Sequence, residues 1–138
     1  MSKTPEQIVK QIMLENDAFS QLLGMQVVAV AEGACTVSLE VTKAMTNGFG
    51  IAHGGITYSL SDSAFAFACN SLGYMAVSVE TSISHMQKVS VGDQLSAKAT
   101  MVQRSRSLGR FVVQVHNQTG ELVSDFKGTC YFTDKKYE

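Results

Sequence analysis

The fold is decided by residues 47–72, NGFGIAHGGITYSLSDSAFAFACNSL. The first part of this stretch is a loop broken by glycines, and Gly54-Gly55 then open a run with no further glycine or proline up to about Leu72. Apolar residues recur in that run at the 3.6-residue period of an α-helix, and the remaining faces are also small or apolar. A helix that is apolar nearly all round is buried. We therefore predict one long central helix.

Strand-like segments lie on both sides of this helix. Before it, two runs follow Met25 with a turn at Glu32-Gly33, and the second run alternates polar and apolar residues as a half-buried strand does. The connections between the later strands are too short for crossovers, so these strands are antiparallel neighbours. We predict an α+β domain in which a curved antiparallel sheet wraps the helix. The later strands are expected at about 76–85, 94–105, 110–117 and 122–133.

The N-terminal segment predicts a further helix. Thr4-Pro5-Glu6-Gln7 combines a capping hydroxyl, a proline at the first helical position and a glutamine at capping-box distance, so the helix should run from about Pro5 to Asn16. No repeat or linker divides the chain, and residues 1–138 are predicted to form one domain. Long strands leave an open sheet edge, which a second copy often closes. We expect a homodimer at least.

Composition excludes several classes of protein. The chain is 45% hydrophobic with one proline, and no stretch approaches the roughly 18 apolar residues of a membrane span. The first ten residues lack the apolar core of a signal peptide, so we expect a cytoplasmic protein without a membrane partner. The three cysteines lack C-x-x-C spacing and are interpreted as buried reduced thiols. The three histidines are scattered, so no metal site is predicted.

Charge is unevenly distributed along the chain. The net charge of −1 argues against a nucleic-acid partner. Between Asp93 and Glu121, however, there is no acidic residue. Either this basic segment receives an anionic ligand, or its side chains are simply solvated. The basic residues in it are Lys98, Arg104, Arg106 and Arg110.

Asp62 is the first candidate for chemistry. It lies two turns inside the predicted helix, where aspartate has poor helix propensity and burial of its charge is costly without a partner. One interpretation is a structural carboxylate bonded to Ser59, Ser61 or the backbone. The other is a general base or nucleophile whose pKa is moved by burial. The absence of any lysine or arginine from residue 44 to 87 favours the second interpretation.

The start of the helix is the second candidate. Gly54 and Gly55 leave unpaired backbone N–H groups open to a ligand, and these donors can stabilise a carbonyl oxygen that becomes negative, although a tight turn would also explain two glycines. Eight residues separate Gly54 from Asp62, which is about 12 Å along a helix. One carbonyl cannot touch both in the same chain. Two antiparallel helices in a symmetric dimer would bring them together and create two equivalent sites.

The spacing Asn47-x2-Gly50-x2-His53-Gly54-Gly55-x4-Leu60-x-Asp62 resembles the signature of the PaaI-type hotdog-fold acyl-CoA thioesterases, a family named for phenylacetic acid degradation. The continuation SAFAFACNS at 63–71 is also close to that family, and the resemblance covers about 19–133. It implies a hotdog fold, with a curved antiparallel sheet around one long central helix. It also implies a dimer that commonly pairs into a tetramer.

The resemblance implies roles for the residues of the motif. Asp62 would be the catalytic carboxylate, and Gly55, with Gly54 beside it, would polarise the thioester carbonyl. Asn47 and His53 would position the thioester or the attacking water across the dimer interface. Each of these two has a simpler interpretation, since asparagine also forms turns and a histidine can fix a loop.

The resemblance extends to the strand after the helix. Ser78 matches a position that supports the attacking water in some relatives, or it is an ordinary strand serine. Glu80 and Thr81 follow it and are expected to line the acyl pocket. Arg104 and Arg106 are expected to hold the phosphates of CoA.

The predicted function is hydrolysis of an acyl-CoA thioester to free acid and CoA. The resemblance favours aromatic acyl groups such as phenylacetyl or hydroxyphenylacetyl, followed by medium-chain acyl groups. CoA is part of the substrate, and no metal or redox cofactor is required. The alternatives are a non-catalytic acyl-CoA-binding module and a hotdog dehydratase or hydratase acting on 3-hydroxyacyl thioesters.

Overall fold

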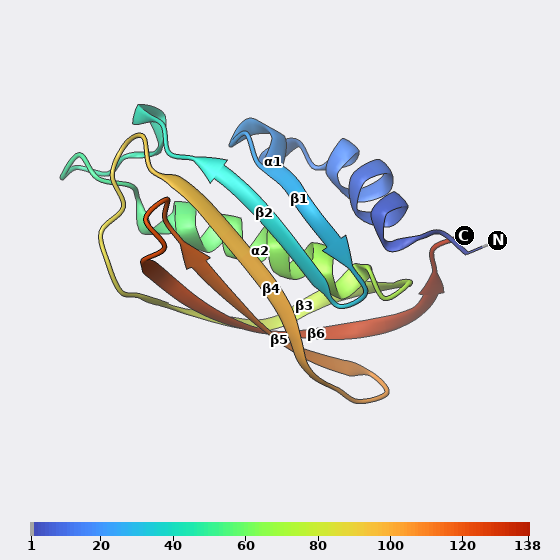
Figure 1. Cartoon of the computed structure of the whole chain (residues 1–138). Coiled ribbons are helices and arrows are strands. Elements are labelled where there is room, and N and C mark those ends of the chain that lie inside the picture. The colour runs from blue at the N-terminus through green and yellow to red at the C-terminus, as the bar shows by residue number, and fades with distance from the viewer. Residues whose placement is uncertain (1) are drawn as a thin grey trace.

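One curved antiparallel sheet wraps around a single long helix, α2 (Gly54–Asn70), as Figure 1 shows. The computed structural model describes residues 2–138; Met1, with which the predicted domain begins, lies outside them. The strand order in the sheet is β1-β2-β4-β5-β6-β3, and every pairing is antiparallel. The predicted α+β architecture is therefore confirmed. The strands are β1 (Gln26–Ala31), β2 (Ala34–Glu40), β3 (Tyr74–His85), β4 (Gln94–Arg104), β5 (Leu108–His116) and β6 (Leu122–Lys136).

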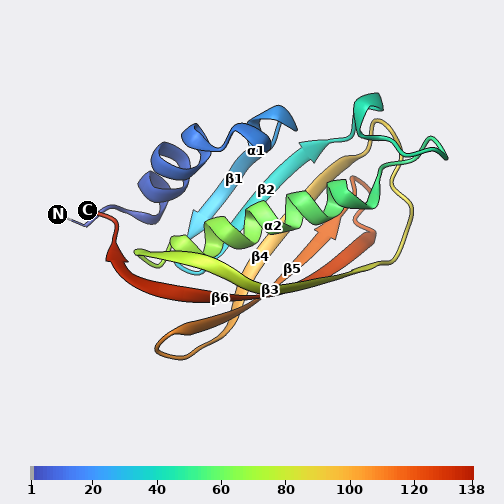
Figure 2. The ribbon, with the colours of Figure 1, turned by 180° about the vertical axis from the view of Figure 1, so that it is seen from behind.

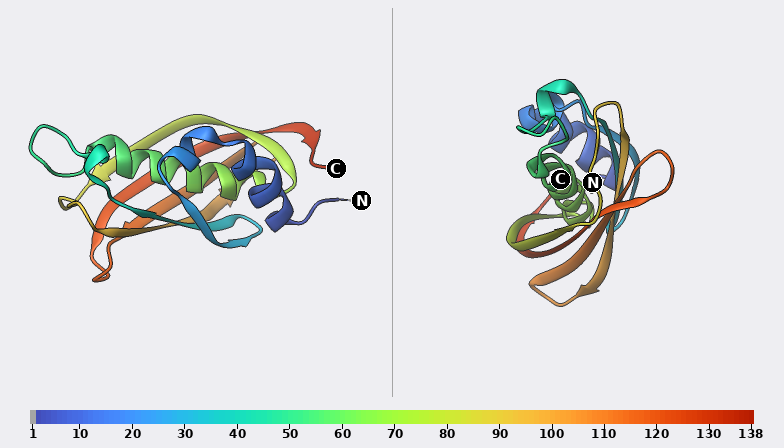
Figure 3. Two further views of the ribbon diagram at one scale, coloured as in Figure 1. Left: turned by 90° about the horizontal axis from the view of Figure 1, so that it is seen from above. Right: turned by 90° about the vertical axis from the view of Figure 1, so that its left-hand side faces the viewer.

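The core forms where α2 packs on the concave face of the sheet. Figure 3 shows this end-on, with the sheet curving around the helix. Phe65 of α2 is 1% exposed, and its ring meets that of Phe111 edge to face with centroids 5.7 Å apart. A Cβ at Gly128 of β6 would stand 2.7 Å from the Phe65 ring, so the strand needs glycine there for this close approach. Burial of one such side chain contributes about 1.5–3 kcal/mol.

One stripe of α2 is not covered by the sheet. Gly55, Ser59, Asp62 and Ala66 are partly exposed along it, at the spacing of successive turns. Figure 2 shows α2 from the side that the strands do not cover. The prediction of a helix buried on all sides is therefore wrong for this stripe, because one sheet and one N-terminal segment cannot enclose the whole circumference.

The N-terminal segment is helical, as predicted, but its winding differs. A π-helix (η1, Gln7–Met13) continues into one 3₁₀ turn (η2, Leu14–Asn16), and a short α-helix follows (α1, Ala18–Leu22). Ile8 and Val9 are fully buried and anchor the segment. The Ser20 hydroxyl of α1 lies 2.8 Å from that of Ser63, which ties α1 to α2.

The two sheet edges are β1 and β3. On β3 the side chains of Val77 and Val79 are 56% and 61% exposed. Apolar side chains on an unpaired edge are a surface suited to a partner strand. Among residues 2–138, no helix is both long and apolar enough to cross a membrane.

Candidate active site

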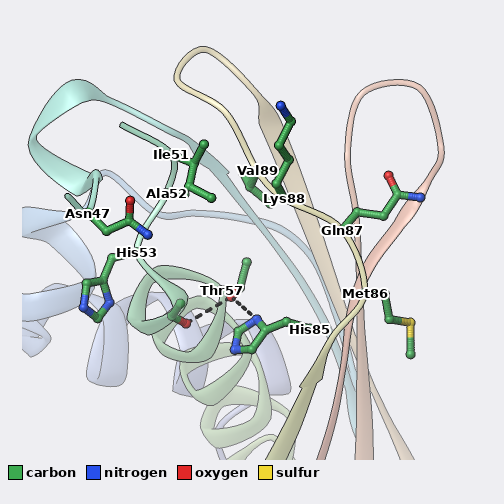
Figure 4. A pocket seen from close by; sticks show the side chains of 11 residues that line it. Asn47, Ile51, Ala52, His53, Thr57, His85, Met86, Gln87, Lys88 and Val89 are labelled. Atoms are coloured by element: carbon green, nitrogen blue, oxygen red, sulfur yellow. Dashed lines mark hydrogen bonds between the residues drawn. The ribbon is translucent and has the colours of Figure 1, made fainter. Parts of the chain in front are cut away.

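A cleft of about 380 Å³ opens at the N-terminal end of α2. Three segments that are distant in the sequence form it: the loop before α2, the first turn of α2, and the end of β3 with the chain that follows. Figure 4 shows residues from these three segments around the start of the helix. The lining residues are Asn47, Ile51, Ala52, His53, Gly54, Thr57, His85, Met86, Gln87, Lys88 and Val89.

Backbone hydrogen bonds fix the loop before α2. The Asn47 N–H donates to the Ile51 carbonyl at 2.8 Å, and the Ala52 N–H donates to the Val89 carbonyl at 2.8 Å. The second bond joins the loop to the segment after β3. The side-chain oxygen of Asn47 accepts from the Phe49 N–H at 2.9 Å, so this residue does form a turn. Its amide nitrogen is turned toward the cleft (Figure 4).

His53 caps α2. Its backbone is extended (φ −61°, ψ 139°), and its Nδ1 accepts from the Gly55 N–H at 2.9 Å. This bond fits the simpler interpretation of His53, a residue that fixes the helix start. The same bond occupies the N–H that was predicted to polarise the carbonyl. Within residues 2–138, the Gly54 N–H has no hydrogen-bond partner, so it is the available donor.

His85, at the end of β3, lies across the helix start from His53 (Figure 4). Its Nδ1 is 3.2 Å from the Thr57 hydroxyl, which in turn donates to the Gly54 carbonyl at 3.1 Å. Its Nε2 would stand 3.3 Å from a Cβ at Gly54. Glycine at position 54 therefore gives the imidazole access to the first turn of the helix.

Asp62 lies on the partly exposed stripe of α2, two turns from the cleft. Among the described residues, none forms a hydrogen bond or ion pair with its carboxylate, and no bond to Ser59 or Ser61 is formed. The hydrogen bonds that the structural interpretation of Asp62 requires are therefore not formed among the described residues. Burial raises the pKa of this carboxyl, and the negative charge of Asp17 in the neighbouring N-terminal segment adds to the effect.

The three candidate site residues on β3 point to different faces of the sheet. Ser78 pairs with the buried Cys130, and Thr81 contacts the hydroxyl of Tyr58 in α2, so both lie on the helix side. Glu80 pairs with Thr129, whose side chain is on the outer face. Glu80 therefore points away from α2, where it lines a hollow of about 510 Å³ together with Thr81, and its place in the acyl pocket stays a prediction.

The predicted basic residues lie away from the cleft of their own chain. Arg104 ends β4 and Arg106 is in the turn that follows, at the end of the sheet opposite the start of α2 (Figure 1). They line a second hollow, of about 590 Å³, where the Arg104 guanidinium lies 4.4 Å above the ring of Phe132. Lys88, which no pattern in the sequence marks, lines the cleft itself.

All three cysteines are buried and free, as predicted. Burial and the neighbouring Cys130 raise the pKa of the Cys69 thiol, which keeps it protonated and unreactive. Within residues 2–138, no group of three histidine, cysteine or acidic side chains gathers as metal ligands would.

Comparison with known proteins identifies relatives over most of the chain. The family model described as the Thioesterase superfamily matches residues 49–124. The acyl-coenzyme A thioesterase PaaI of Escherichia coli is 37% identical over 119 residues, which cover 86% of this chain and 85% of that protein. The structure of E. coli PaaI, from the phenylacetic acid degradation operon, superposes with a TM-score of 0.92 at 32% identity and covers 97% of both chains.

Two solved relatives contain ligands. A Streptococcus mutans protein bound to acetyl-CoA has a TM-score of 0.79 and 28% identity, covering 83% of this chain and 91% of that one. A Streptococcus pneumoniae thioesterase with coenzyme A has a TM-score of 0.79 and 25% identity, covering 83% of this chain and 88% of that one. The latter has also been solved with an aspartate or a threonine replaced by alanine.

Proposed function

This chain belongs to the thioesterase superfamily and is a thioester hydrolase of the PaaI type with a hotdog fold, and from that premise we propose that it hydrolyses aromatic acyl-CoA thioesters at the cleft beside α2. The observation that carries the proposal is an unpaired carboxylate, Asp62, on the same helix whose first N–H, at Gly54, opens into a cleft. A base and an oxyanion donor are the two groups that thioester hydrolysis needs.

The complete site requires a second copy of the chain. The Gly54 N–H and Asp62 are about 12 Å apart along one helix, so they act on one carbonyl only if they come from different subunits. Two features support such a dimer: the uncovered stripe of α2, on which Asp62 lies, and the apolar edge of β3. Antiparallel packing of two such stripes places each Asp62 near the partner's cleft. We extend this assembly to a dimer of dimers.

The chemistry follows from these positions. The thioester carbonyl accepts a hydrogen bond from the Gly54 N–H, at the positive end of the helix dipole, and the carbon becomes more electrophilic. Asp62 of the partner subunit takes a proton from water as the water attacks that carbon, or attacks the carbon itself. The tetrahedral intermediate then expels the thiolate of CoA. One such oxyanion donor contributes roughly 10²–10³ in rate.

The remaining residues have supporting roles. Asn47 directs its amide toward the thioester, and Ser78, on the helix side of β3, holds the attacking water. The alanine variants of the Streptococcus pneumoniae thioesterase support the pairing of Asp62 with Ser78, because the replaced aspartate and threonine are separated by the same number of positions as these two residues. His53 keeps the helix start in place and does not touch the substrate.

CoA binds through its anionic groups. Lys88 lines the cleft, and Arg104 and Arg106 of another subunit reach the same ligand once the dimer forms. The relatives solved with acetyl-CoA and with coenzyme A support a CoA thioester as the ligand. The likeness to PaaI supports phenylacetyl or hydroxyphenylacetyl groups, with medium-chain acyl groups as the second class. We also propose that the enzyme is cytoplasmic.

A kinetic panel of aryl and alkyl acyl-CoAs tests this function. Release of free thiol is followed with a thiol reagent, and we expect the highest kcat/KM with phenylacetyl or hydroxyphenylacetyl groups. The same protein is offered an enoyl-CoA, whose hydration is followed by loss of its absorbance. Hydration without thiol release would support the dehydratase or hydratase alternative, and tight binding without any turnover would support the binding module.

A further inference from the structure

The cleft contains one imidazole whose position the proposed hydrolysis does not yet use. His85 enters from the end of β3 and lies against the first turn of α2, beside the Gly54 N–H that is proposed to hold the thioester carbonyl. The side chain is exposed to the cleft in the free chain, so a ligand can reach it. His53, in contrast, is engaged by the Gly55 N–H on the other side of the helix.

The contacts of the Thr57 hydroxyl favour one tautomer of this imidazole. The hydroxyl has one proton, and it donates this proton to the Gly54 carbonyl at 3.1 Å. With that proton engaged, the 3.2 Å contact with His85 needs a proton on Nδ1 of the ring, with the Thr57 oxygen as acceptor. In the neutral ring this leaves a lone pair on Nε2, the nitrogen that faces Gly54.

Thr57 therefore orients His85 in either protonation state. The Nδ1 proton stays on Nδ1 whether or not Nε2 carries a second proton, so Nε2 can gain and lose its proton without disturbing the contact. A ring held by a third group so that its other nitrogen faces the substrate is the arrangement used for general acid and base catalysis.

The geometry points to His85 as the catalytic residue that protonates the sulfur of CoA when the thioester bond breaks. This inference rests on the proposed thioester hydrolysis. A thioester whose carbonyl oxygen accepts from the Gly54 N–H can direct its sulfur toward Nε2, because Nε2 would stand only 3.3 Å from a Cβ at Gly54. The opposite wall of the cleft is formed by Asn47 and Lys88 and, among the described residues, has no imidazole.

The proton balance of the step is complete. Water forms the new C–O bond and gives a proton to Asp62 of the partner subunit. The C–S bond breaks, its electron pair goes to sulfur, and His85 Nε2 donates the proton that converts the thiolate into free CoA thiol. The proton held by Asp62 returns through solvent to Nε2 before the next turnover, and the remaining proton of the carboxylic acid product is released to water.

The test compares two leaving groups. Phenylacetyl-CoA expels an alkyl thiolate that needs the proton, whereas the phenylacetyl ester of p-nitrothiophenol expels an aryl thiolate that does not. For His85→Phe we expect kcat for the CoA ester to fall by about 10², the usual contribution of a general acid, while kcat for the aryl thioester stays within about threefold of wild type. His116→Phe, on β5 outside the cleft, is the matched control and should leave both rates unchanged.

Thr57 provides a second variant. Thr57→Val keeps the shape of this buried side chain but removes the acceptor, and kcat for the CoA ester should fall by roughly tenfold, as for one lost hydrogen bond, with Thr57→Ser restoring it. An equal fall for both substrates in both variants would show a merely structural role and overturn the inference. So would an unchanged rate in His85→Phe. If wild-type protein releases no CoA at all, the proposed function fails instead.

Discussion

The proposed arrangement of each site across two chains predicts complementation between two inactive variants. Asp62→Asn removes the proposed base, and Gly54→Pro removes the proposed oxyanion donor. Proline suits the first position of a helix, and His53 already has the extended backbone that a residue before proline prefers (φ −61°, ψ 139°). Gly54→Ala is the matched control, because it adds the same Cβ beside His85 but keeps the N–H.

The recovered activity can be worked out from the geometry. In a dimer of one Asp62→Asn chain and one Gly54→Pro chain, one site carries both changes and the other carries neither. Random exchange of equal amounts makes half of the dimers mixed, so about one quarter of the wild-type activity should return. Each variant alone should retain about 1% or less, since losing one oxyanion donor costs roughly 10²–10³ and losing the base at least as much.

The assay measures CoA release after the two variants have exchanged subunits, with mixed dimers quantified by native mass spectrometry on differently tagged chains. If mixed dimers form and activity stays at the level of the separate variants, then Gly54 and Asp62 do not serve one substrate in trans, and the proposed site is refuted. If Gly54→Ala is as inactive as Gly54→Pro, the added Cβ beside His85 accounts for the loss in both variants, and the loss cannot be assigned to the N–H.

Three further predictions follow from single contacts. Gly128→Ala should lower the free energy of unfolding, measured in urea, by about 1–3 kcal/mol, because its Cβ would stand 2.7 Å from the ring of Phe65. The control Gly48→Ala, whose Cβ meets nothing within 4 Å, should change this free energy by less than about 0.5 kcal/mol. Equal effects of the two variants would contradict the packing argument. Burial and the charge of Asp17 raise the pKa of Asp62, so kcat/KM should be lost as the pH falls through a pKa above that of an ordinary aspartate. Asp17→Asn can still cap α1 and should move the acid limb of the pH profile to lower pH. An unmoved acid limb would exclude the influence of Asp17. Lys88→Ala should raise KM for acyl-CoA roughly twofold to fivefold with little change in kcat, because Lys88 lines the cleft. The variant should also weaken the salt dependence of KM. A change in kcat alone would exclude a role of Lys88 in CoA binding.

Much of the fold is predictable from the sequence because each main element has a strong local pattern. The long apolar run after Gly54-Gly55 predicts α2 to within two residues of its observed end at Asn70. Alternation predicts the second strand, Ala34–Glu40, whose burial alternates in the same way. The winding of Gln7–Met13 as a π-helix is not predictable, since apolar spacing does not distinguish it from an α-helix over so few turns.

A β-bulge explains why the strand candidates divide between two faces. The register of β3 on β6 shifts between Ser78 and Glu80. In a regular strand, two residues that are two positions apart point to the same face, so Ser78 and Glu80 are expected to lie together. The extra residue, Val79, reverses this alternation, and Thr81 takes the place beside Ser78. Nothing in the local sequence marks the bulge.

The cleft itself depends on contacts between distant segments. Asn47, Gly54 and His53 are recognisable because they surround the start of a helix within one stretch of sequence. His85 and Lys88 are not, because their approach to this helix start depends on β3 occupying the sheet edge beside β6. A histidine near the end of a strand is the only signal that the sequence offers for His85. The hydrogen bond from the Gly55 N–H to His53 also depends on the side-chain rotamer of His53, which the sequence does not reveal.

The catalytic role of Asp62 is tested most directly by the rate of CoA release from phenylacetyl-CoA, compared between wild type and Asp62→Asn. We predict that the variant loses about 10²–10⁴ in kcat, the contribution of a general base, while it binds a non-hydrolysable thioether analogue as wild type does. Its melting temperature should not fall, because Asn removes a half-buried charge that no described residue pairs with. Turnover close to wild type in a folded Asp62→Asn protein would contradict the assignment of Asp62 as the catalytic carboxylate.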